Sequence, residues 1–341
     1  MQFKSVIVSF IGLFFLCGWQ PAEIKSKEKT NTLSPRTKLT EISVNDTKRK
    51  YFVHVPPNYD EDKSLPVIIV FHGGGGRAKT CMWSTGWIAK ADEEGFIAVF
   101  PEGTPPDTSR PGRFTGNPQT WNDGSERSNV GAAQRNISDI EFVSAMLKEL
   151  KKDFKVDERR IYATGFSNGG SMTFRIAREL SESFAAVAPV ASNDWMDEVL
   201  PNRRVPILYI TGTADPLNPI NGGEIFIGKK SFGIKTPVEE MIMNLVEQHG
   251  CSNKPKLIYN KDGAKGIAYR NMQNYESVVF YSLKDHGHTW PGGKNLLPEQ
   301  ISGKNVTKLN ANDIIWDFFE KHSLPRQNNS DDQRDSEKSS K

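Results

Sequence analysis

The chain has 341 residues, of which 44 are basic and 41 are acidic, so its formal net charge is only +3. A charge this small and this dispersed does not predict a nucleic-acid groove. The length would allow two average domains, but α/β folds of this size commonly form one unit around a single large core. The composition therefore favours one folded domain with no nucleic-acid partner, and a monomer is the expectation.

The N-terminal segment has the pattern of an export signal. Lys4 precedes an apolar run over residues 6–16, which is too short to span a bilayer and has the length of a signal-peptide core. Cys17 follows this run and could be the acylated cysteine of a lipoprotein, although the two residues before it are bulkier than signal peptidases prefer. We predict a signal peptide over residues 1–19 and a secreted or periplasmic protein. Membrane attachment is expected only if Cys17 is lipidated.

Two further segments lack the apolar residues needed for a core. Residues 20–38 are rich in Lys, Thr, Ser, Pro and Glu and are expected to be a linker, and residues 325–341 are expected to be a disordered polar tail. The folded body is then expected to span residues 39–324. Its two cysteines, Cys81 and Cys251, could form a disulfide in an oxidising compartment or remain free thiols, and the sequence leaves this open.

Along the body, short apolar runs alternate with segments of helical periodicity. The expected strands cover residues 51–55, 67–71, 96–100, 160–164, 185–190, 205–210 and 278–283. The expected helices cover residues 87–94, 140–150, 171–180, 238–249 and 311–321. The first strand precedes two prolines and is expected at an edge. Buried strands separated by helices predict an α/β fold, with a mostly parallel sheet covered on both faces. Reactive groups gather at the carboxyl ends of such strands.

One motif predicts the chemistry. Residues 165–169, Gly-Phe-Ser-Asn-Gly, follow an expected strand and precede an expected helix. A serine that presents its hydroxyl at the top of a sheet lies on a sharp strand-to-helix turn, and the flanking glycines let strand and helix pass closely. The five residues alone could be an ordinary glycine-rich turn, but the strand and helix supply the required context. The motif therefore predicts a serine hydrolase with Ser167 as nucleophile.

A glycine run, His72-Gly73-Gly74-Gly75-Gly76, directly follows the strand expected over residues 67–71. Backbone N–H groups in such a run can turn toward a developing negative oxygen. We expect the N–H groups of Gly74 and Asn168 to form this oxyanion hole. A phosphate-binding loop is the alternative, but the run lacks the Gly-Lys-Ser/Thr that would follow it.

A serine nucleophile also needs a base and an orienting carboxylate, which this kind of fold supplies in the order Ser, then Asp or Glu, then His. Asp215 lies just past an expected strand in a turn of small residues and is the favoured acid, with Asp194 as the alternative. His286 and His288 both follow the last strand. If that segment is extended, they point to opposite sides, so only one of them can reach Ser167.

Five motifs carry a resemblance to a known family. They are residues 72–76, 162–170, 186–191, 212–216 and 287–293. Together they resemble the α/β-hydrolase esterases of the polyhydroxybutyrate depolymerase and feruloyl or acetylxylan esterase group, carbohydrate esterase family one, from about Tyr51 to Phe319. The resemblance implies an α/β-hydrolase fold, His288 as base and Asp215 as acid. His286 departs from the small residue usual at its position.

The resemblance also implies a function, that of a secreted serine carboxylesterase that acts through an acyl-enzyme. No cofactor and no metal are expected, because no Cys/His cluster has the spacing of zinc ligands. Feruloyl or acetyl esters on polysaccharides are the favoured substrates, since no separate binding module follows residue 324. Polyhydroxybutyrate depolymerisation is the runner-up. A serine peptidase and a non-catalytic exported binding protein are more remote alternatives.

Two tryptophans are candidates for substrate contact. Trp290 lies two residues past His288 and could stack on a substrate ring or pack the loop that presents His288. Trp121 lies in an irregular stretch over residues 105–135, a long insertion between an expected strand and an expected helix. Long loops of this kind are often functional, so we expect the insertion to approach the active site.

Overall fold

A computed structural model describes residues 34–114, 116–227 and 230–326. The predicted signal peptide, most of the predicted linker and the predicted tail from residue 327 on lie outside these ranges. A compact unit begins at Pro35. Its first strand begins at Thr37, where Thr37 and Lys38 pair with His54 and Val53 of the following strand. The folded body therefore starts slightly before residue 39, because two residues assigned to the linker are part of the sheet.

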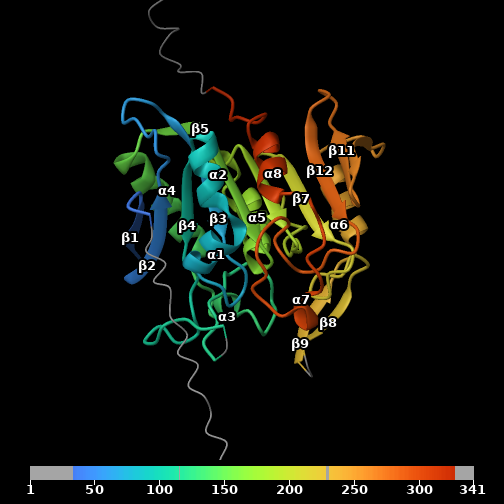
Figure 1. The fold of residues 1–341 in the computed structure, drawn as a ribbon, viewed down its shortest axis with the longest axis horizontal. Helices are drawn as coiled ribbons and strands as arrows, with labels where there is room; N and C mark the ends of the chain where they lie inside the picture. The colour runs from blue at the N-terminus through green and yellow to red at the C-terminus, as the bar shows by residue number, and fades with distance from the viewer. Residues whose placement is uncertain (1–33, 115, 228–229, 327–341) are drawn as a thin grey trace, which may run out of the picture. The chain divides into compact units, whose positions relative to one another are not determined.

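Ten strands of the described residues form one sheet. They are β1 (Thr37–Val44), β2 (Thr47–His54), β3 (Leu65–Phe71), β4 (Ile97–Pro101), β5 (Val156–Phe166), β6 (Ala186–Val190), β7 (Ile207–Gly212), β10 (Lys256–Lys261), β11 (Ala264–Arg270) and β12 (Glu276–Leu283). Their order is β1-β2-β4-β3-β5-β6-β7-β12-β11-β10 (Figure 1). Neighbours from β4 to β12 are parallel, and antiparallel strands extend the sheet at both edges.

Helices cover both faces of this sheet, as predicted. They are α1 (Ala78–Thr85), α2 (Trp87–Glu94), α3 (Gly131–Gln134), α4 (Asp139–Asp153), α5 (Asn168–Glu179), α6 (Val238–Gln248), α7 (Glu299–Ser302) and α8 (Ala311–Phe319), with a 3₁₀ turn over Ser181–Ser183. None of these helices, within the ranges described, is long and apolar enough to cross a membrane.

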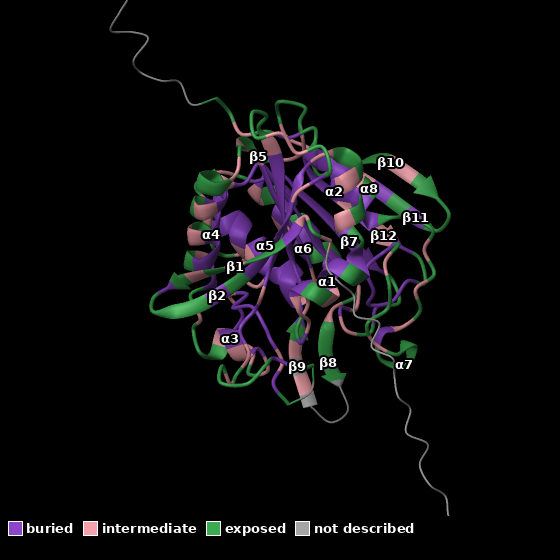
Figure 2. Cartoon of the chain, turned by 60° about the vertical axis from the view of Figure 1, so that its left-hand side comes forward, coloured by how far each residue is buried: buried purple, intermediate pink, exposed green. Residues whose placement is uncertain are grey.

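Alternation along the strands divides the core into two layers. On one face, Val67, Ile69 and Phe71 of β3 pack in a cluster with the apolar sides of α4, α5 and α6. On the other face, Tyr162 of β5 stacks on Phe319 of α8, with ring centroids 4.6 Å apart. Figure 2 shows the central strands buried along their length and α4 buried on one side only. The mostly parallel sheet with helices on both faces confirms the predicted α/β-hydrolase fold.

Some elements differ from expectation. The strand predicted at an edge, β2, lies inside the sheet, because β1 pairs with its outer side. The antiparallel strands β10 and β11 were not predicted, and neither was a separate hairpin of β8 (Gly223–Ile227) and β9 (Lys230–Lys235). The exposed and buried residues of β10 do not alternate cleanly, so its sequence carries little strand periodicity.

The two cysteines of the body are free thiols. Cys81 is buried in α1 and Cys251 is partly buried. Burial raises the pKa of the Cys81 thiol to about 12 and also raises the pKa of Cys251. Of the two alternatives that the sequence left open, the structure has the unpaired thiols.

Candidate active site

The predicted glycine run, nucleophile, acid and base each follow the carboxyl end of a strand in the parallel part of the sheet. Gly74 follows β3, Ser167 follows β5, Asp215 follows β7, and His288 follows β12. These strands lie within one run of five successive neighbours, β3-β5-β6-β7-β12. Since parallel strands end at the same edge, the four residues are brought to one side of the sheet from positions up to 214 residues apart.

Ser167 forms the sharp turn that the motif predicts. It lies between β5 and α5 with φ 55° and ψ −122°, a conformation that residues other than glycine rarely adopt. Its N–H donates to the Val190 carbonyl at 2.9 Å, and its own carbonyl accepts from the Ser171 N–H at 2.9 Å. These bonds to β6 and α5 hold the strained turn in place. The side chain stays only partly buried, as a nucleophile requires.

The glycines around Ser167 are required by close packing. A β carbon at Gly165 would lie 2.9 Å from Cβ of Phe71, and one at Gly169 would overlap the backbone carbonyls of Phe71 and His72. At Gly170 it would lie 2.7 Å from Cβ of Ser192. Helix α5 therefore passes so close to β3 and β6 that side chains at these positions have no space, which is the steric reason given for the motif.

The structure pairs Asp215 with His288. His288 Nδ1 lies 2.7 Å from Asp215 Oδ2, and both side chains are buried. The other oxygen, Oδ1, accepts the N–H groups of Leu217 at 2.8 Å and Asn218 at 2.7 Å. With Nδ1 donating to the carboxylate, Nε2 of His288 is left as the basic nitrogen. The ring of Phe166, the residue before Ser167, lies 4.7 Å from the His288 ring.

The alternative acid and the alternative base have other partners. Asp194 is buried in an ion pair with Arg178 of α5, whose Nε lies 3.2 Å from both carboxylate oxygens. His286 turns to Thr289, with Nε2 3.0 Å from its hydroxyl oxygen, and burial lowers the pKa of this histidine. Neither residue is hydrogen-bonded to His288 in the described part of the chain.

The remaining histidines outside the glycine run are structural. His54, His249 and His322 are buried, and each has a hydrogen-bond partner. The sequence predicts that these three histidines are either structural or exposed, and in the structure all three are buried. Burial and nearby arginines lower the pKa of His249 to about 4, so its ring is neutral near pH 7.

The glycine run lies against the start of α5. A β carbon built at Gly74 would lie 3.7 Å from Cβ of Asn168, so the two backbones are neighbours. The N–H of Gly75 is used by the Gln119 carbonyl at 2.7 Å and that of Gly76 by the Gly73 carbonyl at 2.9 Å, whereas Gly74 N–H donates no bond within the described residues. Asn168 is the first residue of α5, where helix N–H groups lack partners within the helix.

His72 supports this run as a neutral ring. Its Nε2 accepts the N–H of Gly103 at 2.9 Å, so Nδ1 carries the proton and donates to the Gly73 carbonyl at 2.8 Å. Burial lowers the pKa of His72 to about 4, which keeps this hydrogen-bond pattern intact at neutral pH.

The two tryptophans have no free surface for a substrate, which corrects the expectation that they bind it. Trp121 is fully buried, with its indole N–H donating to the His72 carbonyl at 2.9 Å and its ring edge-on to Phe71. Trp290 is 3% exposed, and its indole N–H donates to Asn312 Oδ1 at 2.9 Å. Both rings are therefore packing residues. Their burial is tolerated because each indole N–H has a buried hydrogen-bond partner. Of the two roles predicted for Trp290, its burial fits packing of the loop that presents His288.

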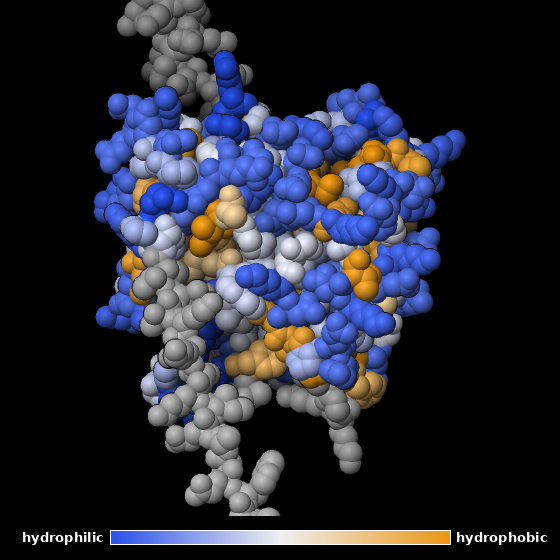
Figure 3. Space-filling view, in the orientation of Figure 1, coloured by the Kyte–Doolittle hydropathy of each residue, from blue (hydrophilic) through white to orange (hydrophobic). Residues whose placement is uncertain are grey.

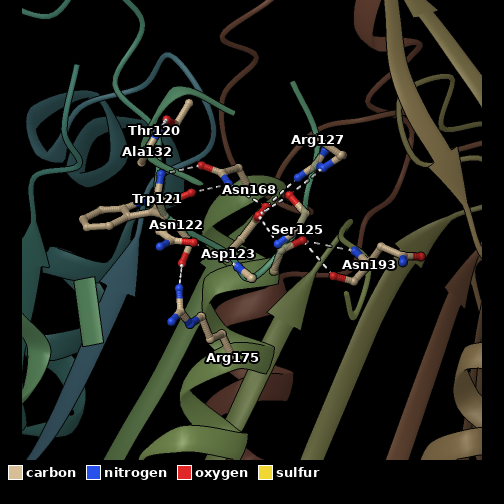
Figure 4. Close-up of polar contacts among 12 residues, drawn as sticks. Thr120, Trp121, Asn122, Asp123, Ser125, Arg127, Ala132, Asn168, Arg175 and Asn193 are labelled. Carbon is tan, nitrogen blue, oxygen red and sulfur yellow. Dashed lines mark hydrogen bonds and ion pairs between the residues drawn. The ribbon is translucent and has the colours of Figure 1, made fainter. Parts of the chain in front are cut away.

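The insertion reaches the site through polar residues that the sequence did not single out. The side chain of Asn168 contacts Trp121 and Asp123, and Asp123 contacts Ser125 and Arg127 (Figure 4). The only sequence signal for Asp123, Ser125 and Arg127 is their place in a long loop, since this stretch has no periodicity and carries none of the motifs described above. Asp123 lies 45 residues from its partner Asn168 along the chain, a separation that local patterns do not reveal.

Phe114 is a second residue that the sequence did not single out. Phe114 is 56% exposed, and a β carbon built on Gly75 would lie only 2.7 Å from Cδ2 of its ring. On the face in Figure 3, exposed apolar groups are small and separate, so a single exposed ring needs no explanation by itself. Phe114 differs because it lies against the glycine run.

The sequence predicted no metal, and the described residues contain no group of three His, Cys, Asp or Glu side chains that could hold one. The expectation of a reaction without metal or cofactor stays a prediction.

The order along the chain of Ser167, Asp215 and His288, the predicted nucleophile, acid and base, is that of α/β-hydrolases. Among protein families, the model of the dienelactone hydrolase family matches residues 53–227, just over half of the chain. The chain belongs to the dienelactone hydrolase family. The match covers the glycine run, the elbow and Asp215, and it ends before the segment that carries His288.

Several curated proteins are similar over most of this chain. A protein of Nocardia uniformis subsp. tsuyamanensis, NocK, assigned as an esterase, is 28% identical over 86% of this chain and 85% of its own length. Feruloyl esterase B of Piromyces equi is 29% identical over 81% of this chain, and the bifunctional acetylxylan esterase/xylanase XynS20E of Neocallimastix patriciarum is 27% identical over 81%. This chain spans only 46% and 34% of the length of these last two proteins.

Among solved structures, an acetyl xylan esterase from Aspergillus awamori superposes on 74% of this chain and 94% of its own, with a TM-score of 0.53. At 13% identity this likeness shows the fold alone. The resemblance to α/β-hydrolase esterases is confirmed, and with it the prediction of an enzyme that is a carboxylic ester hydrolase.

Proposed function

We propose that this enzyme is a serine carboxylesterase that forms an acyl-enzyme on Ser167. The observation that carries the proposal is the 2.7 Å contact between His288 Nδ1 and Asp215 Oδ2, at the same sheet edge as the positive-φ turn of Ser167. A base held by a buried carboxylate, at the same sheet edge as a partly exposed serine on a strained turn, is an arrangement that can activate a hydroxyl for acyl transfer.

In this mechanism His288 Nε2 takes the proton of the Ser167 hydroxyl while Oγ attacks the ester carbonyl. The N–H groups of Gly74 and Asn168 donate to the negative oxygen of the tetrahedral intermediate. His288 then returns the proton to the leaving alcohol, and the acyl group stays on Ser167. A water molecule, deprotonated by His288, releases the acid and restores the serine. Asp215 holds the ring orientation and stabilises its cationic form throughout.

As substrates we propose feruloyl or acetyl esters carried on polysaccharides. The names of the Piromyces and Neocallimastix proteins support this class, and the similarity to each extends over 81% of this chain. Polyhydroxybutyrate oligomers are the runner-up. The test is hydrolysis of a matched panel of methyl ferulate, acetylated xylan, p-nitrophenyl butyrate and 3-hydroxybutyrate oligomers by the purified protein. Preference for the first two would support the proposal, and preference for the oligomers would replace it with the runner-up.

Phe114 is expected to contact the ester on its exposed face. Because the ring lies against the glycine run, an aromatic acyl group such as ferulate could stack on it, and such aromatic contacts are worth about 1 kcal/mol. For Phe114→Ala we expect kcat/KM for methyl ferulate to fall about fivefold, with p-nitrophenyl acetate nearly unaffected. Trp83→Ala, which removes another exposed aromatic side chain, serves as the control. Equal losses on both esters would argue against the contact.

We also propose that the protein is exported. The apolar run over residues 6–16, which has the length of a signal-peptide core, supports this. The expected result for protein recovered from producing cells is a mature N-terminus near residue 20, or a lipid-modified Cys17 at the N-terminus. Mass spectrometry of the N-terminal peptide decides between these two. A peptide that begins at Met1 would contradict export by a cleaved signal.

A further inference from the structure

The side-chain amide of Asn168 is held at both ends by the insertion. Its Oδ1 accepts the backbone N–H of Trp121 at 2.8 Å, and its Nδ2 donates to the Trp121 carbonyl at 3.1 Å (Figure 4). The same Nδ2 donates to Oδ2 of Asp123 at 2.7 Å. Both amide hydrogens and the oxygen are therefore used, on a residue that is 8% exposed. This pattern fits an amide and does not fit a carboxylate of the same shape.

Asp123 is a buried carboxylate in contact with this amide. Its side chain is fully buried, and Oδ1 accepts the Ser125 hydroxyl at 2.6 Å and the Ser125 N–H at 3.2 Å. Oδ2 accepts from Asn168 and also from Arg127 Nη2 at 2.5 Å. Arg127 is held in turn by its Nε donating to the Ser125 hydroxyl at 3.1 Å, with its guanidinium 4.4 Å from the Trp195 ring centroid.

The position of this carboxylate raises an electrostatic question. Asn168 is the first residue of α5, and the positive end of the helix dipole favours negative charge there. In the proposed reaction that negative charge is the oxyanion, and a second anion one side chain away would oppose it. The guanidinium of Arg127, at 2.5 Å from Asp123, balances the charge. The pair can then orient Asn168 without weakening the oxyanion hole.

We propose that Asp123 and Arg127 are positioning residues for the oxyanion hole: Asp123 fixes the residue whose backbone N–H binds the oxyanion, and Arg127 neutralises Asp123. This inference rests on the proposed acyl-enzyme mechanism. It assigns a role to the long insertion, which reaches the catalytic groups through Trp121 and Asp123. It differs from a purely structural role because it predicts that substitution of Arg127 lowers kcat more than substitution of Asp123.

The test is a double-mutant cycle on p-nitrophenyl butyrate. In Asp123→Asn an oxygen still accepts from Asn168 and no anion remains, so we expect kcat to fall only about threefold. In Arg127→Gln the carboxylate keeps the Asn168 and Ser125 donors but loses its countercharge, so kcat should fall on the order of tenfold or more, with KM little changed. The double variant should resemble Asp123→Asn. Asn168→Asp, which is isosteric, should lose more than any of these.

Inhibition by butylboronic acid supplies a readout that a structural role would not move. Its adduct with the serine hydroxyl places a boronate oxygen in the oxyanion hole, so Ki should rise in parallel with the loss of kcat across the cycle. The matched control is the same cycle at Arg178 and Asp194, a buried ion pair on the other end of α5, where melting temperature should change and Ki should not.

The outcomes separate this inference from the proposed mechanism. If Ser167→Ala stays active, the acyl-enzyme mechanism fails. If Ser167→Ala is inactive but the two single variants lose kcat equally and the losses add in the double variant, only the positioning role is wrong. The positioning role would also be wrong if the Asp123 and Arg127 variants had lower melting temperatures but an unchanged Ki for butylboronic acid.

Discussion

Ser167→Ala is expected to abolish ester hydrolysis, with kcat lower by a factor on the order of 10⁶, as in other serine hydrolases that lose the nucleophile. No other group in the described site takes the place of the hydroxyl, because His288 and Asp215 only move and stabilise a proton in the proposed mechanism. The substitution removes one oxygen from a partly buried side chain and leaves the backbone bonds to Val190 and Ser171 intact, so the fold should persist.

The measurement is steady-state hydrolysis of all four panel esters, together with thermal unfolding. A matched control is Ser171→Ala, which removes a buried hydroxyl one turn along α5 that donates to the Asn193 carbonyl at 2.8 Å. Ser171→Ala should lose stability by about 1 kcal/mol and keep most of its activity. A Ser167→Ala protein that folds and still hydrolyses any of the four esters at the native rate would overturn the assignment of the nucleophile.

Asp215→Asn should lower kcat by a factor on the order of 10⁴. In the native protein the Asp215 carboxylate accepts a hydrogen bond from His288 Nδ1 at 2.7 Å. The amide of the variant can turn its NH₂ group toward that nitrogen and so favour the wrong tautomer of the imidazole. Asp194→Asn changes a carboxylate of the same kind that is paired with Arg178, so it should affect stability more than kcat. Steady-state kinetics and melting temperatures of the two variants test this directly, and a deeper loss of kcat in Asp194→Asn would reverse the assignment.

The same contrast distinguishes the histidines. His288→Ala is expected to lose activity about as severely as Ser167→Ala, because the two act as a unit. His286→Ala removes a ring that is hydrogen-bonded to Thr289. We therefore expect only a small decrease in kcat and a larger decrease in stability. Activity losses of equal depth would show that both rings are needed.

Local sequence was enough for the elements whose signals are local. The apolar run that became β3, the glycines around Ser167 and the helical spacing in α5 each reflect contacts within a few residues or a steric limit on one position. The predicted strands and helices of the parallel sheet were found in nearly their observed places for this reason. The sequence predicts no strand at β10 because its pattern of exposure has no clear period, and it predicts an edge position for β2 because nothing local marks Thr37 as a strand start.

Short segments of the sequence predict the class of chemistry: a serine between close-spaced glycines after a strand, a glycine run after an apolar strand, and the order in which the proposed acid and base follow. These are properties of short segments, so they can be read without knowing what packs against them. The folded arrangement of the chain pairs His288 with Asp215 and Asp194 with Arg178, a choice between two carboxylates that local patterns leave open. It also buried Trp121 and Trp290 and brought Asp123 to Asn168. Such choices depend on which distant side chains meet in space, and that is set by how the sheet orders its strands.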